Sequence, residues 1–286
     1  MLQWLKKLSL QKQILWGLLI ASAFILLWVT ANLLPAGLDF HNSFRPVVHT
    51  AISGTSPYEV PGFYNPPWTI IPLIPFAILP ERFGSALMIM AAIASLAYVS
   101  HRMGAKPIAV ILLVLSPPAL HGYLSGNIDW LPVIGYLMPP QIGLFFISIK
   151  PQLGLGVGVY WLAESWREGG WRKTLQVFAP VAIGLLLSFA LFGLWPLKYN
   201  FNAEDWWWNA SLWPTSLPVG LGLMVAALRT RRIEYAIAAS PCFSPYVLFH
   251  SWVVVLIAIV AATPEFIATL TGLWGLIAIR ATTGGK

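Results

Sequence analysis

The sequence predicts an all-α, polytopic membrane protein built as a single transmembrane domain over residues 1–286. Of the 286 residues, 58% are hydrophobic and only 9% are charged. A soluble domain carries about 25% charged residues. The mean hydropathy of +0.73 points the same way. Too few charges remain to cover a soluble globule, which disfavours a soluble enzyme, a nucleic-acid-binding protein and a disordered chain.

The first apolar run, 14–34, has the length of a membrane span. At about 1.5 Å per residue, roughly 21 residues extend about 30 Å as a helix, which is enough to cross a bilayer. Lys6, Lys7 and Lys12 precede it. A signal peptide has a shorter core of about 7–15 residues. We therefore expect an uncleaved first span with a cytoplasmic N-terminus.

Short, proline-broken segments follow, and they predict broken helices rather than straight spans. The chain contains 23 Pro and 23 Gly. Segment 67–80 contains Pro72 and Pro75, and segment 130–149 contains Pro139 and Pro140. We expect both segments to dip into the membrane and return. In total we expect about 8–10 membrane segments, including short broken helices.

The basic residues indicate the orientation of these segments. They gather at 102–106, 167–173 and 229–232, which places these turns on the cytoplasmic side. The outer loops are then 35–66 and 195–213. The second loop contains Asp205 and the tryptophans 206–208, which we interpret as an interfacial aromatic belt rather than a sugar-stacking surface. All three Asp of the chain fall on the outer side.

Asp39 directly follows the first span and is the leading catalytic candidate. An ionisable residue at membrane depth is costly and therefore usually functional. A carboxylate there can act as a general base or hold a metal. The alternative is a solvated loop acid that caps the next helix.

Asn127 and Asp129 form a second polar cluster that could bind a sugar hydroxyl or a cation, and helix N-capping is the alternative for both.

Lys150 lies between two apolar stretches, where it can bind a phosphate or extend to the membrane interface. Other candidates for the predicted substrate-binding set are His41, Arg45, Tyr58, Asn65 and His250. A lone histidine in an apolar segment is more often structural.

The single cysteine, Cys242, excludes an intrachain disulfide. No metal-site motif and no nucleotide-binding motif occurs.

Several short motifs occur in a characteristic order along the chain. After Asp39 come GTSPY at 54–58, FYNPPW at 63–68, LSP at 115–117, GNID at 126–129, KP at 150–151 and SPY at 244–246. This order resembles the polytopic C-type (GT-C) glycosyltransferases, and it is most similar to the family 87 mannosyltransferase-like proteins with their "PY … YPP … KP" pattern. The chain departs from these relatives in being shorter and in having the single acid Asp39 after the first span instead of a paired Asp/Glu motif.

The resemblance implies a GT-C bundle with an outward-facing active site on the first outer loop. It implies a polyprenyl-phosphate sugar donor, a lipid or glycan acceptor, and Asp39 as general base or metal-binding acid. Lys150, Arg45 and His41 become candidates for the donor phosphate. No cofactor is required, although a divalent cation is one group that such an acid could hold.

The expected location is a bacterial plasma membrane, among membrane lipids and without nucleic acid. Two alternatives remain open. One is a transporter or permease with Asp39, Asp129 and Lys150 along the substrate path. The other is a non-catalytic membrane subunit of a larger complex.

Overall fold

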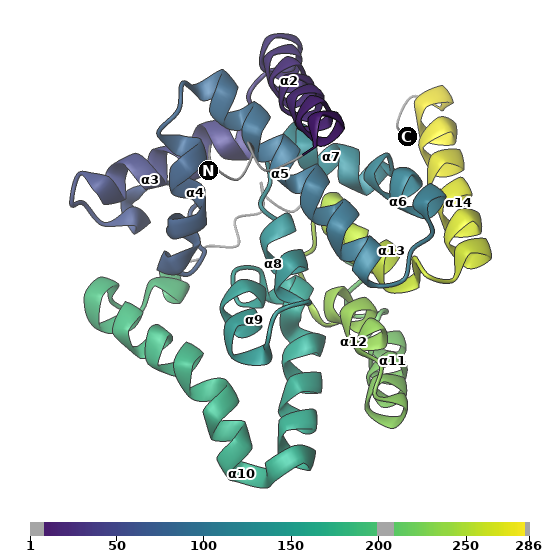
Figure 1. Cartoon of the computed structure of the whole chain (residues 1–286). Coiled ribbons are helices and arrows are strands. Elements are labelled where there is room, and N and C mark those ends of the chain that lie inside the picture. Colours follow the sequence, from purple (N-terminus) through teal and green to yellow (C-terminus); the bar gives the residue numbers. More distant parts are fainter. Residues whose placement is uncertain (1–8, 199–208, 284–286) are drawn as a thin grey trace.

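The computed structural model describes residues 9–198 and 209–283, and helices make up its architecture (Figure 1). No strand occurs in these residues, where Asn209 and Leu248 form an isolated β-bridge. The predicted all-α fold is therefore confirmed. Three helices are long and apolar enough to cross a membrane: α2 (Leu10–Leu33), α5 (Glu81–Arg102) and α10 (Pro151–Phe192). The pair α6 (Pro107–Val114) and α7 (Pro117–Ser125), bent by 48°, is a fourth candidate span.

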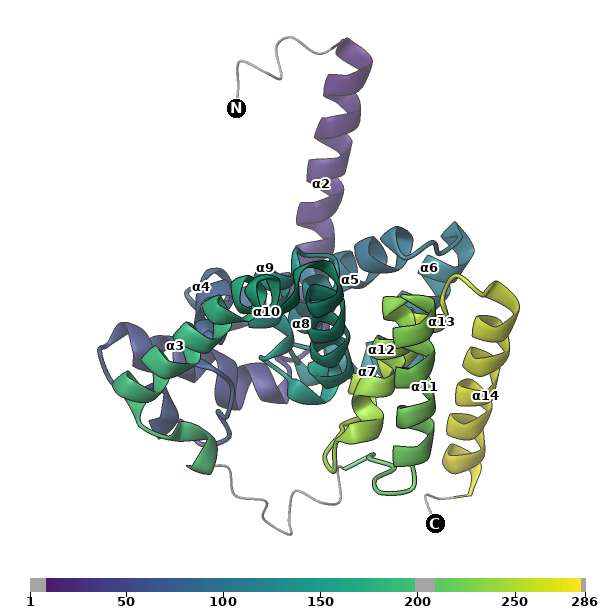
Figure 2. The ribbon, with the colours of Figure 1, turned by 90° about the horizontal axis from the view of Figure 1, so that it is seen from below.

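Helix α2 corresponds to the predicted first span and stands away from the other helices (Figure 2). Ala31, near its C-terminal end, is its buried residue, and this end packs against α5. The π-helical turn η1 (Phe40–Phe44) and α3 (Arg45–Ile52) then follow, within the predicted outer loop 35–66. A 3₁₀ turn, η2 (Pro57–Glu59), precedes the next segment. Because α2 is apolar on all sides, it suits a lipid environment.

The two proline-broken segments form helices too short for a full crossing. Segment 67–80 contains the 3₁₀ turn η3 (Pro67–Thr69) and the 8-residue α4 (Ile70–Ala77). Segment 130–149 contains α8 (Trp130–Gly135) and α9 (Pro140–Ile147), of 6 and 8 residues. A membrane span needs about 20 residues. The prediction that neither segment is a single full-length span is therefore confirmed.

Helix α10 is long but sharply bent. Its 42 residues are interrupted at Gly169 and at Gly170, whose φ of +60° and ψ of −150° leave the helical region. The two arms diverge from this bend (Figure 1). The bend lies within 167–173, where the basic residues predicted a turn between membrane segments. An arm of roughly 20 residues extends about 30 Å.

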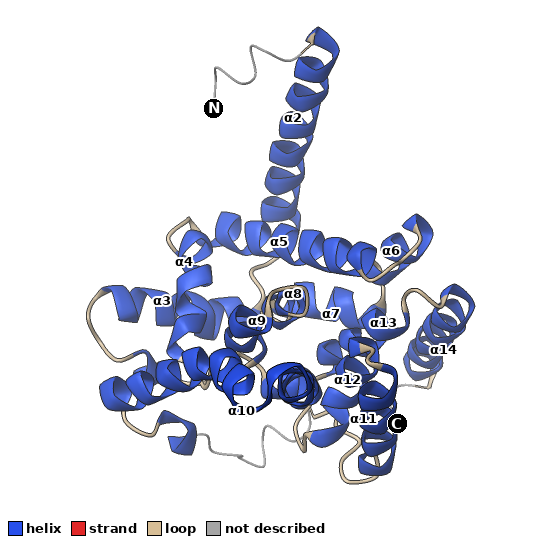
Figure 3. Ribbon diagram, turned by 60° about the horizontal axis from the view of Figure 1, so that its bottom comes forward, coloured by secondary structure: helices blue, strands red, loops and turns tan. Residues whose placement is uncertain are grey.

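The C-terminal third is built from further short helices around the core (Figure 3). Their order is η4 (Trp195–Lys198), α11 (Leu217–Thr230), α12 (Ile233–Ala239), η6 (Ser240–Phe243), η7 (Phe249–Trp252), α13 (Val253–Ile259) and α14 (Thr263–Thr282). Part of the predicted outer loop 195–213, including Glu204, Asp205 and Trp206–Trp208, lies outside the described residues.

A close contact between two glycines brings the N-terminal loop to the centre of the bundle. Gly126 ends α7 in the left-handed region, with φ +68°, where glycine is favoured. Gly37 lies directly against it, because a Cβ atom on Gly37 would be only 2.2 Å from the Gly126 nitrogen. The Gly37 amide also lies 3.5 Å from Ser85 Oγ at the start of α5. This contact positions Asp39 beside the turn that leads from α7 into α8.

We expect Gly37→Ala to destabilise the protein by about 1–3 kcal/mol or more, because the new methyl group would overlap backbone atoms that cannot move aside. Thermal unfolding of the purified protein in detergent measures the change. Gly222→Ala is the matched control, since nothing lies within 4 Å of its added methyl group and alanine favours α11. Equal melting temperatures for Gly37→Ala and the wild type would show that the contact is not constrained.

Candidate functional site

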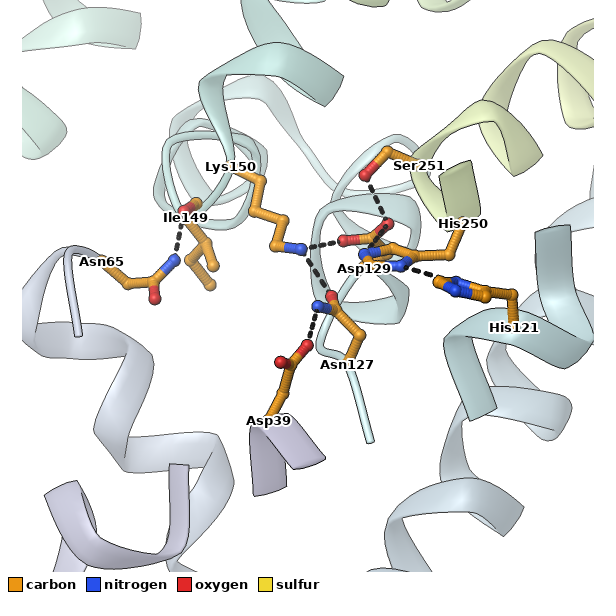
Figure 4. Close-up of polar contacts among 9 residues, drawn as sticks. All are labelled: Asp39, Asn65, His121, Asn127, Asp129, Ile149, Lys150, His250 and Ser251. Atoms are coloured by element: carbon orange, nitrogen blue, oxygen red, sulfur yellow. Dashed lines mark hydrogen bonds and ion pairs between the residues drawn. The ribbon is translucent and has the colours of Figure 1, made fainter. Parts of the chain in front are cut away.

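A continuous chain of hydrogen bonds joins Lys150 to Asp39 (Figure 4). The Lys150 ammonium donates to Asp129 Oδ1 and, over 2.5 Å, to Asn127 Oδ1. Asn127 Nδ2 in turn donates to Asp39 Oδ2, also over 2.5 Å. The Asn127 amide therefore has one orientation, with its oxygen toward the ammonium and its nitrogen toward the carboxylate. The structure therefore brings the side chains of Asp39, Asn127, Asp129 and Lys150 together in one place.

Local structure explains how these side chains reach each other. Gly126 ends α7, and the next three residues lead into α8. The middle one, Ile128, is fully buried in the core, and this anchors its neighbours Asn127 and Asp129. Asp129 occupies the N-cap position of α8, but its side chain makes no capping hydrogen bond. Lys150 occupies the N-cap position of α10, before Pro151. The capping alternative for Asp129 is therefore wrong, and Lys150 does not extend to the membrane interface.

The ion pair is buried, which makes each partner depend on the other. Asn127, Asp129 and Lys150 are each only 7% exposed. Burial alone would raise the pKa of Asp129, but the charge of Lys150 and the hydrogen bonds from Lys150 and Ser251 outweigh it and hold this pKa below its usual value. Asp129 is therefore ionised and compensates the Lys150 charge.

Asp39 opens onto a cavity of about 1130 Å³. Asn127, Lys150 and His250 also line it, and Lys150 is the only Lys or Arg among its described lining residues. Burial is the main influence on Asp39 and raises its pKa above the usual value, against the opposing effects of Lys150 and Asn127. The remaining wall is largely apolar, with Leu38, Phe44, Leu124, Leu185 and Leu248. The cavity lining thus combines the polar cluster with many apolar side chains.

Two residues that the sequence did not single out complete the network. His121 Nδ1 lies 3.3 Å from His250 Nδ1, with the two rings stacked, and His121 lines the cavity. Ser251 donates to Asp129 Oδ2 over 2.8 Å, and His250 Nε2 lies 3.5 Å from the same oxygen. No local pattern distinguishes His121 from a structural histidine in an apolar helix, because its partner lies 129 residues away.

Asn65 and Tyr58 support the cavity from the first loop. Asn65 lines the cavity, and its side chain donates to the Ile149 carbonyl oxygen over 2.8 Å. Tyr58 donates to the Asn65 carbonyl oxygen over 3.0 Å and stacks on Trp195, another lining residue. Tyr58 itself does not line the cavity, so its role there is to support Asn65 and Trp195.

His41 and Arg45, two of the predicted phosphate ligands, do not line this cavity. The His41 side chain is 59% exposed and pairs with Glu81. Arg45 Nε is buried and makes no hydrogen bond within the described part of the chain. Residues two positions apart on a helical turn point in different directions, which explains why His41 does not follow Asp39 into the cavity.

The described residues contain no group of three His, Cys, Asp or Glu side chains that could hold a metal ion. One of the two carboxylates is already paired with Lys150. The site can therefore supply one carboxylate with an opposing ammonium group nearby, in a cavity open to a partly apolar ligand. No family model, curated protein or solved structure matches the chain.

We expect Lys150→Met to destabilise the protein by about 3–5 kcal/mol, because it leaves the Asp129 carboxylate buried without its cation. Lys150→Met combined with Asp129→Leu removes both charges, and we expect it to recover most of this loss. Melting temperatures in detergent measure both variants. A double variant as unstable as the single one would mean that the ion pair is not the source of the effect.

Proposed function

We propose that this chain is an integral membrane glycosyltransferase of the GT-C type. It transfers a hexose, with mannose as the first candidate, from a polyprenyl-phosphate donor to a lipid or glycan acceptor on the extracytoplasmic side of a bacterial plasma membrane. The observation that carries the proposal is the Asp39 carboxylate, held by Asn127 in the wall of a large cavity. The motif order that begins at Asp39 supports it independently.

Asp39 has the position and the chemistry of a general base. An acceptor hydroxyl becomes a better nucleophile as it loses its proton, and a carboxylate within hydrogen-bond reach can take that proton. Asn127 occupies one Asp39 oxygen, Oδ2. The other oxygen is left for the acceptor, and the raised pKa makes Asp39 a stronger base than an exposed aspartate.

The polar and apolar parts of the cavity match the two parts of the donor. The apolar lining residues can contact the polyprenyl chain, and Asn65 and Lys150 can contact the sugar and the phosphate. In the reaction, the acceptor oxygen forms a bond to the anomeric carbon while the bond from that carbon to the phosphate oxygen breaks. The lipid phosphate leaves with the electron pair of that bond, and the Lys150 ammonium stabilises its charge.

A transporter is the second candidate, because of one specific observation. The Asp129–Lys150 pair is buried where the short helices α8 and α9 meet the start of α10. Transporters place binding sites at such interruptions of membrane helices. Uptake of sugars or sugar phosphates by proteoliposomes, without transfer to any acceptor, would favour this function. A purely structural subunit has no need of a polar group of this kind facing a cavity.

We expect Asp39→Asn to lose about 10²- to 10⁴-fold in transfer rate while still folding and binding donor lipid, because the amide cannot accept the proton. The assay uses purified protein in lipid, radiolabelled polyprenyl-phosphate mannose or glucose, and a panel of lipid and glycan acceptors. Glu265→Gln in α14, an exposed acid, is the matched control. Full activity of Asp39→Asn rules out the base role. No transfer by the wild type contradicts the proposal and favours a non-catalytic subunit.

The pH profile provides a second test. Asp39 must be ionised to act, so activity should fall as the pH drops through its pKa. Because burial raises this pKa, the fall should begin at a higher pH than for an exposed aspartate. Asn127→Leu removes a hydrogen bond that favours the ionised form, so the acid limb should move to still higher pH. A limb that stays in place or moves to lower pH would contradict this assignment.

A further inference from the structure

The bend of α10 and the turn between α11 and α12 are joined into one basic corner. We define the basic corner by its cationic side chains: Arg167, Arg172, Lys173, Arg229, Arg231 and Arg232. Arg167 Nη1 donates to the Leu228 carbonyl oxygen over 2.8 Å. The Tyr160 hydroxyl donates to the Arg231 carbonyl oxygen over 3.0 Å. These bonds hold the first arm of α10 against the end of α11.

The basic corner has more positive than negative charge. Glu164 pairs with Arg167 over 2.6 Å and with Arg231 over 3.6 Å. Glu234 lies 3.4 Å from Arg232, and Glu168 is the remaining acid of the corner. Six cationic side chains therefore face three acidic ones. Arg167 and Arg231 connect the two turns. Of the four other cations, Lys173 is half-buried, and Arg172, Arg229 and Arg232 are exposed to an external partner.

Aromatic side chains surround these cations. Trp166 and Trp171 are 60% and 62% exposed on either side of the bend. The Arg172 guanidinium lies 5.6 Å from the Trp171 ring centre, and that of Arg232 lies 5.4 Å from the Tyr235 ring centre. Exposed tryptophans beside arginines are typical of the level at which a membrane meets water.

Apolar surface leads up to the basic corner along both arms of α10. Leu155 on the first arm and Leu186 on the second are 48% and 67% exposed. Leu162 on the first arm and Leu175 on the second are 45% and 57% exposed. In a bilayer these surfaces contact acyl chains, so the lipids that cover them present their headgroups to the basic corner.

We propose that the basic corner binds the headgroups of anionic phospholipids. The excess of cations supplies the charge complement, and the flanking apolar arms and tryptophans favour a lipid over a soluble anion. Juxtamembrane basic residues interact with anionic lipids in this way, and each contributes about fivefold in binding. The inference concerns a different part of the chain from Asp39 and does not depend on the proposed function.

The test measures lipid binding by the full-length chain in detergent. Native mass spectrometry would follow titration with phosphatidylglycerol and, separately, with phosphatidylcholine. The corner variant carries Arg172→Gln, Arg229→Gln and Arg232→Gln, and keeps Arg167 and Arg231. The matched control removes three exposed charges elsewhere, through Lys12→Gln, Arg82→Gln and Arg280→Gln. Melting temperatures establish that both variants are folded.

We expect the wild type and the control to bind phosphatidylglycerol more tightly than phosphatidylcholine. The corner variant should lose about 10- to 100-fold in affinity for phosphatidylglycerol alone. An equal loss in the control, or no preference for phosphatidylglycerol in the wild type, would overturn the proposal. So would displacement of the lipid by equimolar glycerol phosphate or inorganic phosphate, which would identify a soluble anion as the ligand. Should the triple variant unfold, the single variants Arg172→Gln and Arg229→Gln must each show a smaller loss of the same kind.

Discussion

The site depends on the interactions of the buried Lys150 ammonium group with Asp129 and Asn127. A charge in this position must be paired and hydrogen-bonded, since removing one partner of a buried pair costs about 3–5 kcal/mol. Asp129 supplies the opposite charge and Asn127 a further acceptor. The same charge fixes which way the Asn127 amide faces, and that amide fixes Asp39. Through Ser251, which donates to Asp129, the C-terminal third of the chain joins the same network. One cation thus links segments far apart in the sequence.

This network requires broken helices, and the structure satisfies the polar backbone groups that such breaks expose. In an apolar environment every unpaired carbonyl is costly. Near the end of α9, Trp68 Nε1 donates to the Phe145 carbonyl oxygen over 2.8 Å. Asn65 does the same for the carbonyl oxygen of Ile149, just before α10 begins. The side chains that donate to these carbonyl oxygens come from the first loop and from η3. The loop that provides Asp39 therefore also stabilises the junction that provides Lys150.

Helix α10 connects the candidate site to the basic corner. Its first residue follows Lys150, which lines the cavity, and Arg167 and Arg172 of the basic corner lie on either side of its bend. Between them the first arm packs against α9 and α12, which keeps both ends fixed relative to the core. The candidate site and the basic corner therefore lie at the two ends of the first arm of α10. The glycine pair at the bend allows the second arm to turn away and contribute Leu185 to the cavity wall.

The sequence by itself determined the helical class, the positions of the long apolar helices, the broken segments 67–80 and 130–149, and the candidacy of Asp39, Asn127, Asp129 and Lys150. It did so because apolar length, proline position and rare charges in an apolar chain are local signals. Only the tertiary structure decided which candidates meet. His41 points away from the cavity although it lies two residues from Asp39. His121 lines the cavity and contacts His250, which lies 129 residues away in the sequence. Such pairings depend on how the helices are rotated and on the contact between Gly37 and Gly126. Both are set by packing between distant segments, so the local sequence pattern does not predict them.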